Sequence, residues 1–418
     1  MEPVRHSINS MNFTSQPLNL SGTSYGVTSQ ASDIVKKLMD KVSFGILGTQ
    51  GVKDDKSKVV SATSLAPVLG MLLACMDDKE RKALVLGIPA DALTDELEIE
   101  IHKKLGEFSV KHAYGEHPDE EQAISCANLL AFANTLNNEQ LNQILSECYQ
   151  TEKLDCQGHW LADVTDAYVN EKTRGKIKSL FGGLSQGERD RITAVIANVM
   201  EFRGIWEHEM PKHRTVPGRF LCANGSIIKN VIMMCSTEIL QFVHNKDFGA
   251  IGKKFRSANG EDLKLVAITP ADSENPTAID KLDYETIDHL IERLNYREVK
   301  LDLKLPKIKM TDSCDTHLLD KISQTFGTDI IKAEDLSRLG KPGGQQLEIL
   351  QKVSLSVDEE GAHGTVATAA TRRLRGMSKG CYFHFDCPGY IAIVDRQGNR
   401  LLEMMIKDGS FFEFQGEP

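Results

Sequence analysis

The chain has 418 residues, of which 41% are hydrophobic and 26% charged, and its formal net charge is −10. This composition is typical of a globular protein, and the acidic balance argues against a broad nucleic-acid interface. The nine cysteines are widely spaced and form no C-x-x-C pair, which argues against a zinc site and a disulfide framework. Reduced thiols of this kind favour an intracellular protein.

The N-terminal segment 1–32 is polar and lacks the continuous apolar core of a signal peptide. We therefore expect a loosely packed tail over residues 1–32 and a cytoplasmic location, or secretion if a leader has been removed. The longest apolar stretch, 65–76, is too short to cross a bilayer, so we expect no membrane association.

Helical spacing of apolar residues dominates the first half of the chain. The predicted helices cover residues 33–45, 64–76, 94–107, 139–147 and 159–180, with a break near Gly175 in the last. The run 124–132 fits a strand or a helix, because periodicity alone does not separate the two.

Strand-like runs dominate the second half. They cover residues 193–202, 227–234, 264–269, 299–305, 347–357 and 390–394, and helical patterns interrupt them at 283–294 and 315–326. No Pro-rich or Gly/Ser-rich linker and no internal repeat occurs between residues 33 and 418. The pattern predicts one α+β domain over 33–418, with a mainly antiparallel sheet system.

Four separated segments resemble signatures of the serpin family. They read Y-V-N-E-K-T-R-G-K-I at 168–177, N-V-M-E-F-R-G-I-W at 198–206, L-P-K at 305–307 and V-D-E-E-G at 357–361. The second is followed at similar intervals by Thr215, Phe220 and the pair Met233-Met234. Their order and spacing together are specific, although each piece alone is weak.

The resemblance implies a serpin fold, in which helices pack around three mainly antiparallel β-sheets and a reactive-centre loop, here about 361–382, stays exposed. It also implies a sheet-opening region formed by Ser61, Ser64, Asn198, Trp206 and Thr215. The chain departs from the family pattern at Ser61–Ser64, in the charged run 77–82, at Gln351 and at Gly389. Most of these departures bear on how fast the main sheet opens.

The stretch 360–371 could enter a sheet on its own chemistry, because most of its side chains are small or β-branched, it contains no proline, and its one bulky titratable residue, His363, has the outward parity. Two glycines supply backbone freedom where the chain must bend. By resemblance, the loop hinge comprises Glu359, Glu360, Gly361, Ala362, His363, Gly364 and Thr365. The strand period of two then turns the uncharged set Ala362, Gly364, Val366, Thr368 and Ala370 inward.

The family's counting places the scissile residue fourteen positions after Gly361, which gives the reactive bond Arg375–Gly376. Target specificity would then rest on Arg372, Arg373, Leu374 and Arg375. Arg375 suits a trypsin-like pocket with an acidic floor. Two alternatives stay open: Leu374 suits papain-like, cathepsin L-like cysteine proteases, and Arg372 to Arg375 meet the Arg-x-x-Arg pattern of furin-like convertases.

The expected function is therefore suicide-type protease inhibition, in which the target supplies the catalytic groups and is held as an acyl-enzyme. A non-inhibitory serpin, such as a carrier or chaperone, is the rival hypothesis. The G-x-S-x-G match at 376–380 is no hydrolase site, because only His384 follows the serine and no acid lies between.

We expect no cofactor and no metal, since the histidines show no ligand spacing. We also expect no polyanion site, because Asp77, Asp78 and Glu80 interleave with Lys79, Arg81 and Lys82 and predict a solvated face. The partner would be a target protease, and the chain would be a monomer.

Overall fold

A computed structural model describes the parts of the chain on which the following account rests. They are residues 25–48, 55–113, 124–132, 138–155, 161–172, 178–182, 184–202, 204–257, 262–315, 322, 325–326, 336, 338, 346–362 and 381–415. The expected loop from His363 to Gly380, and most of the expected helix at 315–326, lie outside them.

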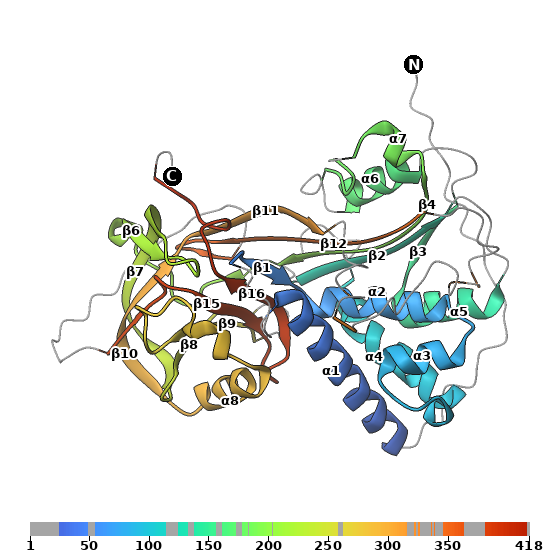
Figure 1. The fold of residues 1–418 in the computed structure, drawn as a ribbon, viewed down its shortest axis with the longest axis horizontal. Helices are drawn as coiled ribbons and strands as arrows, with labels where there is room; N and C mark the ends of the chain where they lie inside the picture. The colour runs from blue at the N-terminus through green and yellow to red at the C-terminus, as the bar shows by residue number, and fades with distance from the viewer. Residues whose placement is uncertain are drawn as a thin grey trace.

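Five helices gather on one face of a long sheet, and two more lie on its other face (Figure 1). The first set is α1 (Tyr25–Leu47), α2 (Ala62–Ala74), α3 (Lys79–Leu86), α4 (Asp95–Lys111) and α5 (Glu139–Tyr149). The second set is α6 (Leu161–Lys172) and α7 (Gln186–Arg189). Side-chain caps begin the main helices, because Ser61, Thr94 and Asn138 accept hydrogen bonds from backbone N–H groups of the first turns.

Helix α1 begins at Tyr25, within the segment 1–32 that was expected to form a polar tail. The polar first turns are ordered by tertiary contact rather than by their own hydrophobicity. Ala31 is fully buried, and Thr28 Oγ1 donates to Glu100 Oε2 of α4 at 3.3 Å.

The long sheet has the order β3-β2-β4-β12-β13-β5, and β11 pairs with β12. Its members are β2 (Ile124–Phe132), β3 (Glu152–Asp155), β4 (Ile192–Phe202), β5 (Gly204–Ile205), β11 (Ile308–Asp315), β12 (Gln346–Val357) and β13 (Gly361–Ala362). The segment 124–132, ambiguous in sequence, is thus a strand, antiparallel to β4. Strands β4 and β12 are parallel neighbours.

A second sheet has the order β1-β16-β15-β9-β8-β7-β10-β14, with β6 paired to β7. Its strands are β1 (Lys58–Val60), β6 (Val216–Leu221), β7 (Ile227–His244), β8 (Phe248–Lys254), β9 (Lys264–Pro270), β10 (Glu298–Pro306), β14 (Cys381–His384), β15 (Gly389–Val394) and β16 (Arg400–Ile406). Helix α8 (Tyr284–Leu294) covers it, and the short 3-10 helices are η1 (Ala90–Ala92), η2 (Lys212–Arg214) and η3 (Ala278–Lys281). Where three sheets were expected, the long strand β7 joins two of them into one hydrogen-bonded system.

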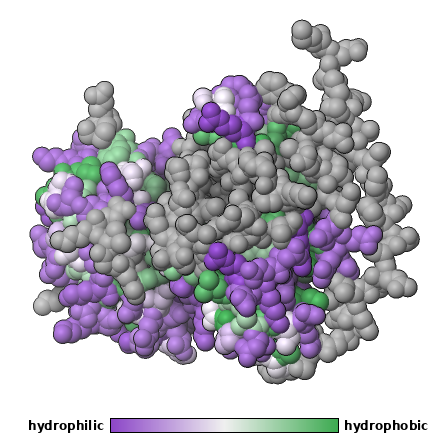
Figure 2. Space-filling view, turned by 45° about the vertical axis from the view of Figure 1, so that its right-hand side comes forward, coloured by the Kyte–Doolittle hydropathy of each residue, from purple (hydrophilic) through white to green (hydrophobic). Residues whose placement is uncertain are grey.

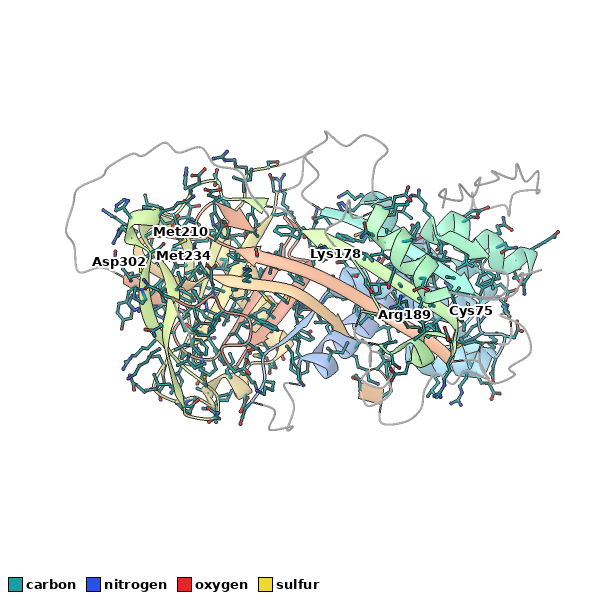
Figure 3. The ribbon with its side chains drawn as sticks, turned by 90° about the horizontal axis from the view of Figure 1, so that it is seen from above. Cys75, Lys178, Arg189, Met210, Met234 and Asp302 are labelled. Atoms are coloured by element: carbon teal, nitrogen blue, oxygen red, sulfur yellow. The ribbon has the colours of Figure 1, made fainter. Side chains whose placement is uncertain are left out.

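The buried apolar residues of the described chain form three clusters. One cluster spans α1 to α5 and extends to α8, β9 and β15, another joins strands of the second sheet to the long sheet near Trp206, and a smaller one lies under α6. Seen from above, Met210 and Met234 lie at one end of the long strands, and Cys75 and Arg189 at the other (Figure 3). Much of the described surface is hydrophilic in the face drawn (Figure 2).

The solvated face expected over residues 77–82 does not include Lys82 at its end. Lys82 is buried, and its Nζ lies 2.5 Å from Glu98 Oε1 of α4. The residue therefore joins two helices and is withdrawn from any polyanion surface. No helix in the described part of the chain is long and apolar enough to span a membrane.

Candidate functional site

The candidate site lies where the parallel pair β4 and β12 ends. The two strands pair directly from Gln346 with Ile192 to Ser354 with Glu201, with no strand between them along that length. Beyond it the ladder parts, and the two-residue strand β13 takes the gap. Val357 of β12 pairs with Ala362 on one side, and Ala362 pairs with Gly204 of β5 on the other.

At this end of the sheet a short antiparallel strand therefore already lies between β12 and β5, and its Ala362 is fully buried. The side chain contributes to the apolar cluster that also holds Val357 and Trp206. Burial of Ala362 agrees with an inward orientation at this one position, and the inward set expected on insertion stays a prediction. The other members of the expected inward set fall outside the described residues.

Gly361 allows β13 to approach β5, and Gly204 of β5 makes room for the Phe255 ring. A Cβ atom on Gly361 would lie 2.0 Å from the carbonyl oxygen of Gly204, and a Cβ on Gly204 would lie 2.6 Å from the Phe255 ring. Any larger residue at position 361 would push β13 away from β5, because no Cβ tolerates a backbone oxygen at that distance.

The turn before β13 is fixed by hydrogen bonds within the hinge. Asp358 Oδ1 accepts from the backbone N–H of Glu360 at 2.8 Å and of Gly361 at 3.2 Å. The Asp358 N–H donates to the Gly361 carbonyl at 2.8 Å. A short polar side chain at this position therefore closes the turn in the way that Asx turns do.

The carbonyl groups of this turn are held by the segment 206–210 that follows β5. The Trp206 indole Nε1 donates to the Asp358 carbonyl, and the Trp206 N–H donates to the Glu360 carbonyl, both at 2.8 Å. The Met210 N–H donates to the Glu359 carbonyl, also at 2.8 Å. Three consecutive hinge carbonyls are thus bound by one segment, which we call the hinge clamp (residues 206–210).

Glu359 anchors the hinge on its other side. Its carboxylate accepts from Thr215 Oγ1 at 2.6 Å and pairs with Lys307 Nζ at 2.9 Å. Burial by itself would raise the pKa of Glu359, but the hydrogen bonds from Lys307 and Thr215 outweigh it and hold this pKa below its ordinary value. The carboxylate is therefore charged at neutral pH and joins β12 to the start of β11 and the end of η2.

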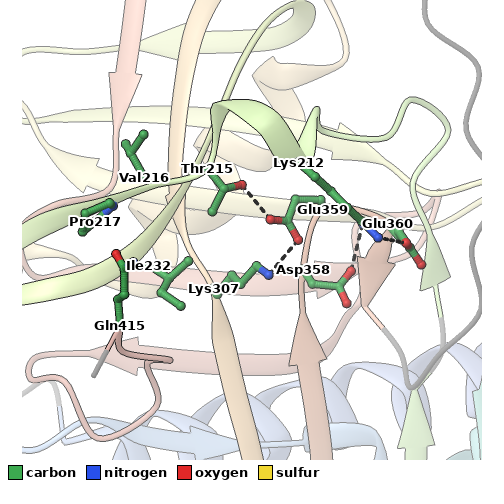
Figure 4. A pocket seen from close by; sticks show the side chains of 10 residues that line it. All are labelled: Lys212, Thr215, Val216, Pro217, Ile232, Lys307, Asp358, Glu359, Glu360 and Gln415. Carbon is green, nitrogen blue, oxygen red and sulfur yellow. Dashed lines mark hydrogen bonds and ion pairs between the residues drawn. The ribbon is translucent and has the colours of Figure 1, made fainter. Parts of the chain in front are cut away.

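A hollow of about 560 Å³ opens beside these groups (Figure 4). Val216, Pro217 and Ile232 form its apolar wall, and the acids of the hinge line the opposite wall. Glu360 at its rim pairs with the exposed Lys212. The hinge thus borders open space on one side.

Trp206 is fixed by stacking as well as by its hydrogen bonds. Its ring lies 4.4 Å from that of Phe255 at an interplanar angle of 8°, and Phe202 meets Phe255 edge-on. The indole is fully buried, so its N–H keeps its bond to the hinge out of water.

The remaining residues of the expected sheet-opening region form a separate cluster under the middle of the sheet. Ser61 Oγ donates to the Leu401 carbonyl at 2.8 Å, and Ser64 Oγ bonds Asn198 Oδ1. Asn198 Nδ2 in turn donates to Asn128 Oδ1 of β2 at 2.7 Å. This buried chain joins α2 to β4 and β2.

The structure therefore groups Trp206 and Thr215 with Glu359, Glu360 and Gly361, and places Ser61, Ser64 and Asn198 apart from them. Sequence reasoning missed the roles of Asp358, Met210 and Asn128. Asn128 carried a usable signal, because it is a polar residue inside an apolar strand-length run. The remaining hinge positions His363, Gly364 and Thr365 and the bond Arg375–Gly376, with Arg372, Arg373 and Leu374, lie outside the described residues.

Comparisons with known proteins agree with this architecture. A family model described as "Serpin (serine protease inhibitor)" matches residues 39–405. Iripin-3 from Ixodes ricinus is 28% identical over 253 residues, which span 59% of this chain and only 61% of Iripin-3. Corticosteroid-binding globulin from Saimiri sciureus is 25% identical over 348 residues, or 81% of each chain.

Among solved structures, the thermophilic serpin tengpin in its native state superposes with a TM-score of 0.68 at 19% identity. The match covers 89% of this chain and 94% of tengpin. At this identity the likeness concerns the fold, and it includes the helices and the two sheet systems described above.

Proposed function

Because this chain belongs to the serpin family, we propose that it inhibits a protease by trapping it as a covalent acyl-enzyme after cleavage of Arg375–Gly376. Serpins are in general protease inhibitors rather than enzymes. In the proposed reaction the target's nucleophile attacks the Arg375 carbonyl, and the new amino terminus at Gly376 departs. The loop then enters the long sheet before the acyl bond is hydrolysed.

The observation that carries the proposal is the state of the hinge. Ala362 is already seated between β12 and β5 as part of a two-residue strand antiparallel to both, and beside this end of the sheet β12 pairs directly with β4. Continued insertion would replace one parallel ladder by two antiparallel ladders. A new strand is gained, which gives a source of free energy for distorting the trapped enzyme.

The side chains from Gly361 to Ala370 support the same reaction, because all except His363 are small or β-branched and His363 has the outward parity. The hinge clamp and Glu359 hold the turn that must extend as insertion proceeds. The polar cluster of Ser64, Asn198 and Asn128 bridges β4 and β2 to α2, below the seam that must part.

For the target we propose a trypsin-like serine protease, since the scissile residue would be Arg375. Leu374 makes a cathepsin L-like enzyme the second choice, and the run from Arg372 to Arg375 makes a furin-like convertase the third.

The test incubates the protein separately with trypsin, a furin-like enzyme and a cathepsin L-like enzyme, followed by denaturing gels and mass analysis. We expect a covalent band with trypsin and a released peptide that begins at Gly376. Arg375→Ala should abolish that band, while Arg372→Ala should leave it. An undiminished complex in Arg375→Ala would place the scissile bond elsewhere.

A carrier function is a second candidate, because the chain aligns over 81% of its length with a protein named for corticosteroid binding. The melting temperature after cleavage distinguishes an inhibitor from a carrier. After nicking within residues 363–380 by a non-target protease, an inhibitory serpin gains a strand and should melt at a much higher temperature. An unchanged melting temperature would favour the carrier.

A further inference from the structure

A buried ion pair lies behind Trp206, between the two sheets. Lys253 of β8 is 1% exposed, and its Nζ lies 2.6 Å from Glu238 Oε2 of β7. Glu238 Oε1 also accepts from Ser236 Oγ at 2.5 Å. Both charges are thus satisfied within an otherwise apolar cluster that contains Trp206, Phe255 and Leu240.

Lys253 makes its other contacts with the hinge clamp. Its Nζ donates to the His208 carbonyl at 2.8 Å and lies 5.2 Å from the centroid of the Trp206 ring, within the range of a cation–π interaction. The ammonium therefore fixes the clamp at its middle and holds the indole from one side, while Phe255 stacks on that indole.

The clamp is what touches the hinge. Trp206 binds the carbonyls of Asp358 and Glu360, and Met210 binds that of Glu359. The order of contacts therefore runs from Glu238 to Lys253, from Lys253 to residues 206–208, and from residues 206–210 to the hinge turn. None of the hydrogen bonds and ion pairs above joins Lys253 or Glu238 to the hinge itself.

A buried charge pair is a poor device for stability, because the desolvation of both ions offsets most of their attraction, and apolar residues of similar volume often do better. The pair can nevertheless fix the geometry of neighbouring groups. An ammonium with three directed donors holds one carbonyl and one ring in a fixed arrangement, which a methionine in the same place cannot do.

We propose that Lys253 and Glu238 form a positioning pair that sets how firmly the hinge is held before cleavage. The inference rests on the proposed function for its purpose, but its physical content concerns the uncleaved molecule alone. Without the pair, residues 206–210 loosen, the carbonyls of residues 358–360 are released more often, and the hinge enters the seam before any protease has acted.

The test is the double variant Lys253→Met with Glu238→Gln, which removes both charges and leaves neither buried alone. Site-resolved hydrogen exchange should show the backbone amides of Trp206 and Met210 exchanging about tenfold faster, as expected for a local opening that has become easier. The Trp206 emission, isolated in a Trp160→Phe background, should move to longer wavelength.

The matched control is Lys264→Met. Lys264 is a second buried lysine of the same sheet, and its Nζ binds Asn295 Oδ1 at 2.9 Å and Gln241 Oε1 at 3.2 Å, away from the clamp. It should leave exchange at Trp206 and Met210 unchanged. Equal acceleration in both proteins would mean general loosening and would overturn the proposal, as would unchanged exchange in the double variant.

If the double variant does not fold, Glu238→Gln alone, which keeps Lys253 and the shape of the site, should still accelerate exchange at the two amides by a smaller factor. Unchanged exchange there would also refute the pair's role. Because exchange is measured on the free protein, it stands apart from inhibition. A wild-type protein that forms no covalent complex with trypsin would remove the proposed function and leave the exchange result to decide the positioning pair.

Discussion

Replacing Glu359 by Gln tests how much the hinge depends on its buried charge. The amide has the shape of the carboxylate and can still accept from Thr215, so the change removes chiefly the ion pair with Lys307 at 2.9 Å. A hydrogen bond between charged groups contributes about 1.5–3 kcal/mol. Lys307 keeps 20% exposure and regains water, so we expect a net loss near the lower end, about 1.5 kcal/mol.

The assay is urea unfolding followed by circular dichroism and Trp fluorescence, with the first transition extrapolated to water. The matched control is Lys212→Gln, which breaks the exposed pair with Glu360 at the same hinge. We expect it to leave the transition where it is, because exposed pairs are screened by solvent.

The stabilisation by Glu359 should depend on pH in a definite direction. The native pKa of Glu359 lies below its ordinary value of 4.5, so its charge stabilises the fold above about that pH and this stabilisation is lost as the pH falls through the native pKa. The gap between wild type and Glu359→Gln should therefore be full at pH 7 and close in acid. A gap that does not vary with pH, or an equal effect of Lys212→Gln, would refute the reasoning.

Three further predictions concern other parts of the fold. Arg400→Met removes the positive partner of the buried Glu403, whose pKa is raised by burial. We expect the free energy of unfolding to fall by about 3 kcal/mol at neutral pH. Because a raised native pKa favours the protonated form, that deficit against wild type should shrink as the pH approaches 4.5 in thermal melts. Asn198→Ala leaves Asn128 Oδ1 and Ser64 Oγ without their partner and should cost about 2–3 kcal/mol in urea unfolding. Gly361→Ala should speed hydrogen exchange at the Trp206 amide by displacing β13, while Gly187→Ala, which meets nothing within 4 Å, should not change it.

Much of the architecture was predictable because burial leaves a periodic trace in the chain. The helix predicted from residue 94 begins at Asp95, and the strand runs at 192–202 and 346–357 match their predictions to within a residue. The strand β7 is longer than predicted, since its second half carries Ser236, Thr237 and Glu238, whose polar side chains hide the alternation.

The sequence predicts a hinge at residues 359–365 by resemblance, but it does not predict the contacts that residues 358–361 make. Small residues after Gly361 indicate a segment that can enter a sheet, yet nothing local to Met210 or Lys253 reveals that they act on it. Both are separated from the hinge by more than one hundred positions of sequence. In the fold Met210 binds the Glu359 carbonyl, and Lys253 contacts residues 206 and 208 beside it.

The amino-acid sequence by itself determined the elements, the order of the family signatures and the chemistry of the segment that is expected to insert, because these depend on side-chain size, period and spacing along the chain. Only the tertiary structure decided that Gly361 and Ala362 already form a short strand between β12 and β5, that the carbonyls of residues 358–360 are bound by residues 206–210, and that a buried lysine contacts residue 208. Those properties depend on which backbone groups face each other across strands, and such pairing is a consequence of packing rather than of local sequence.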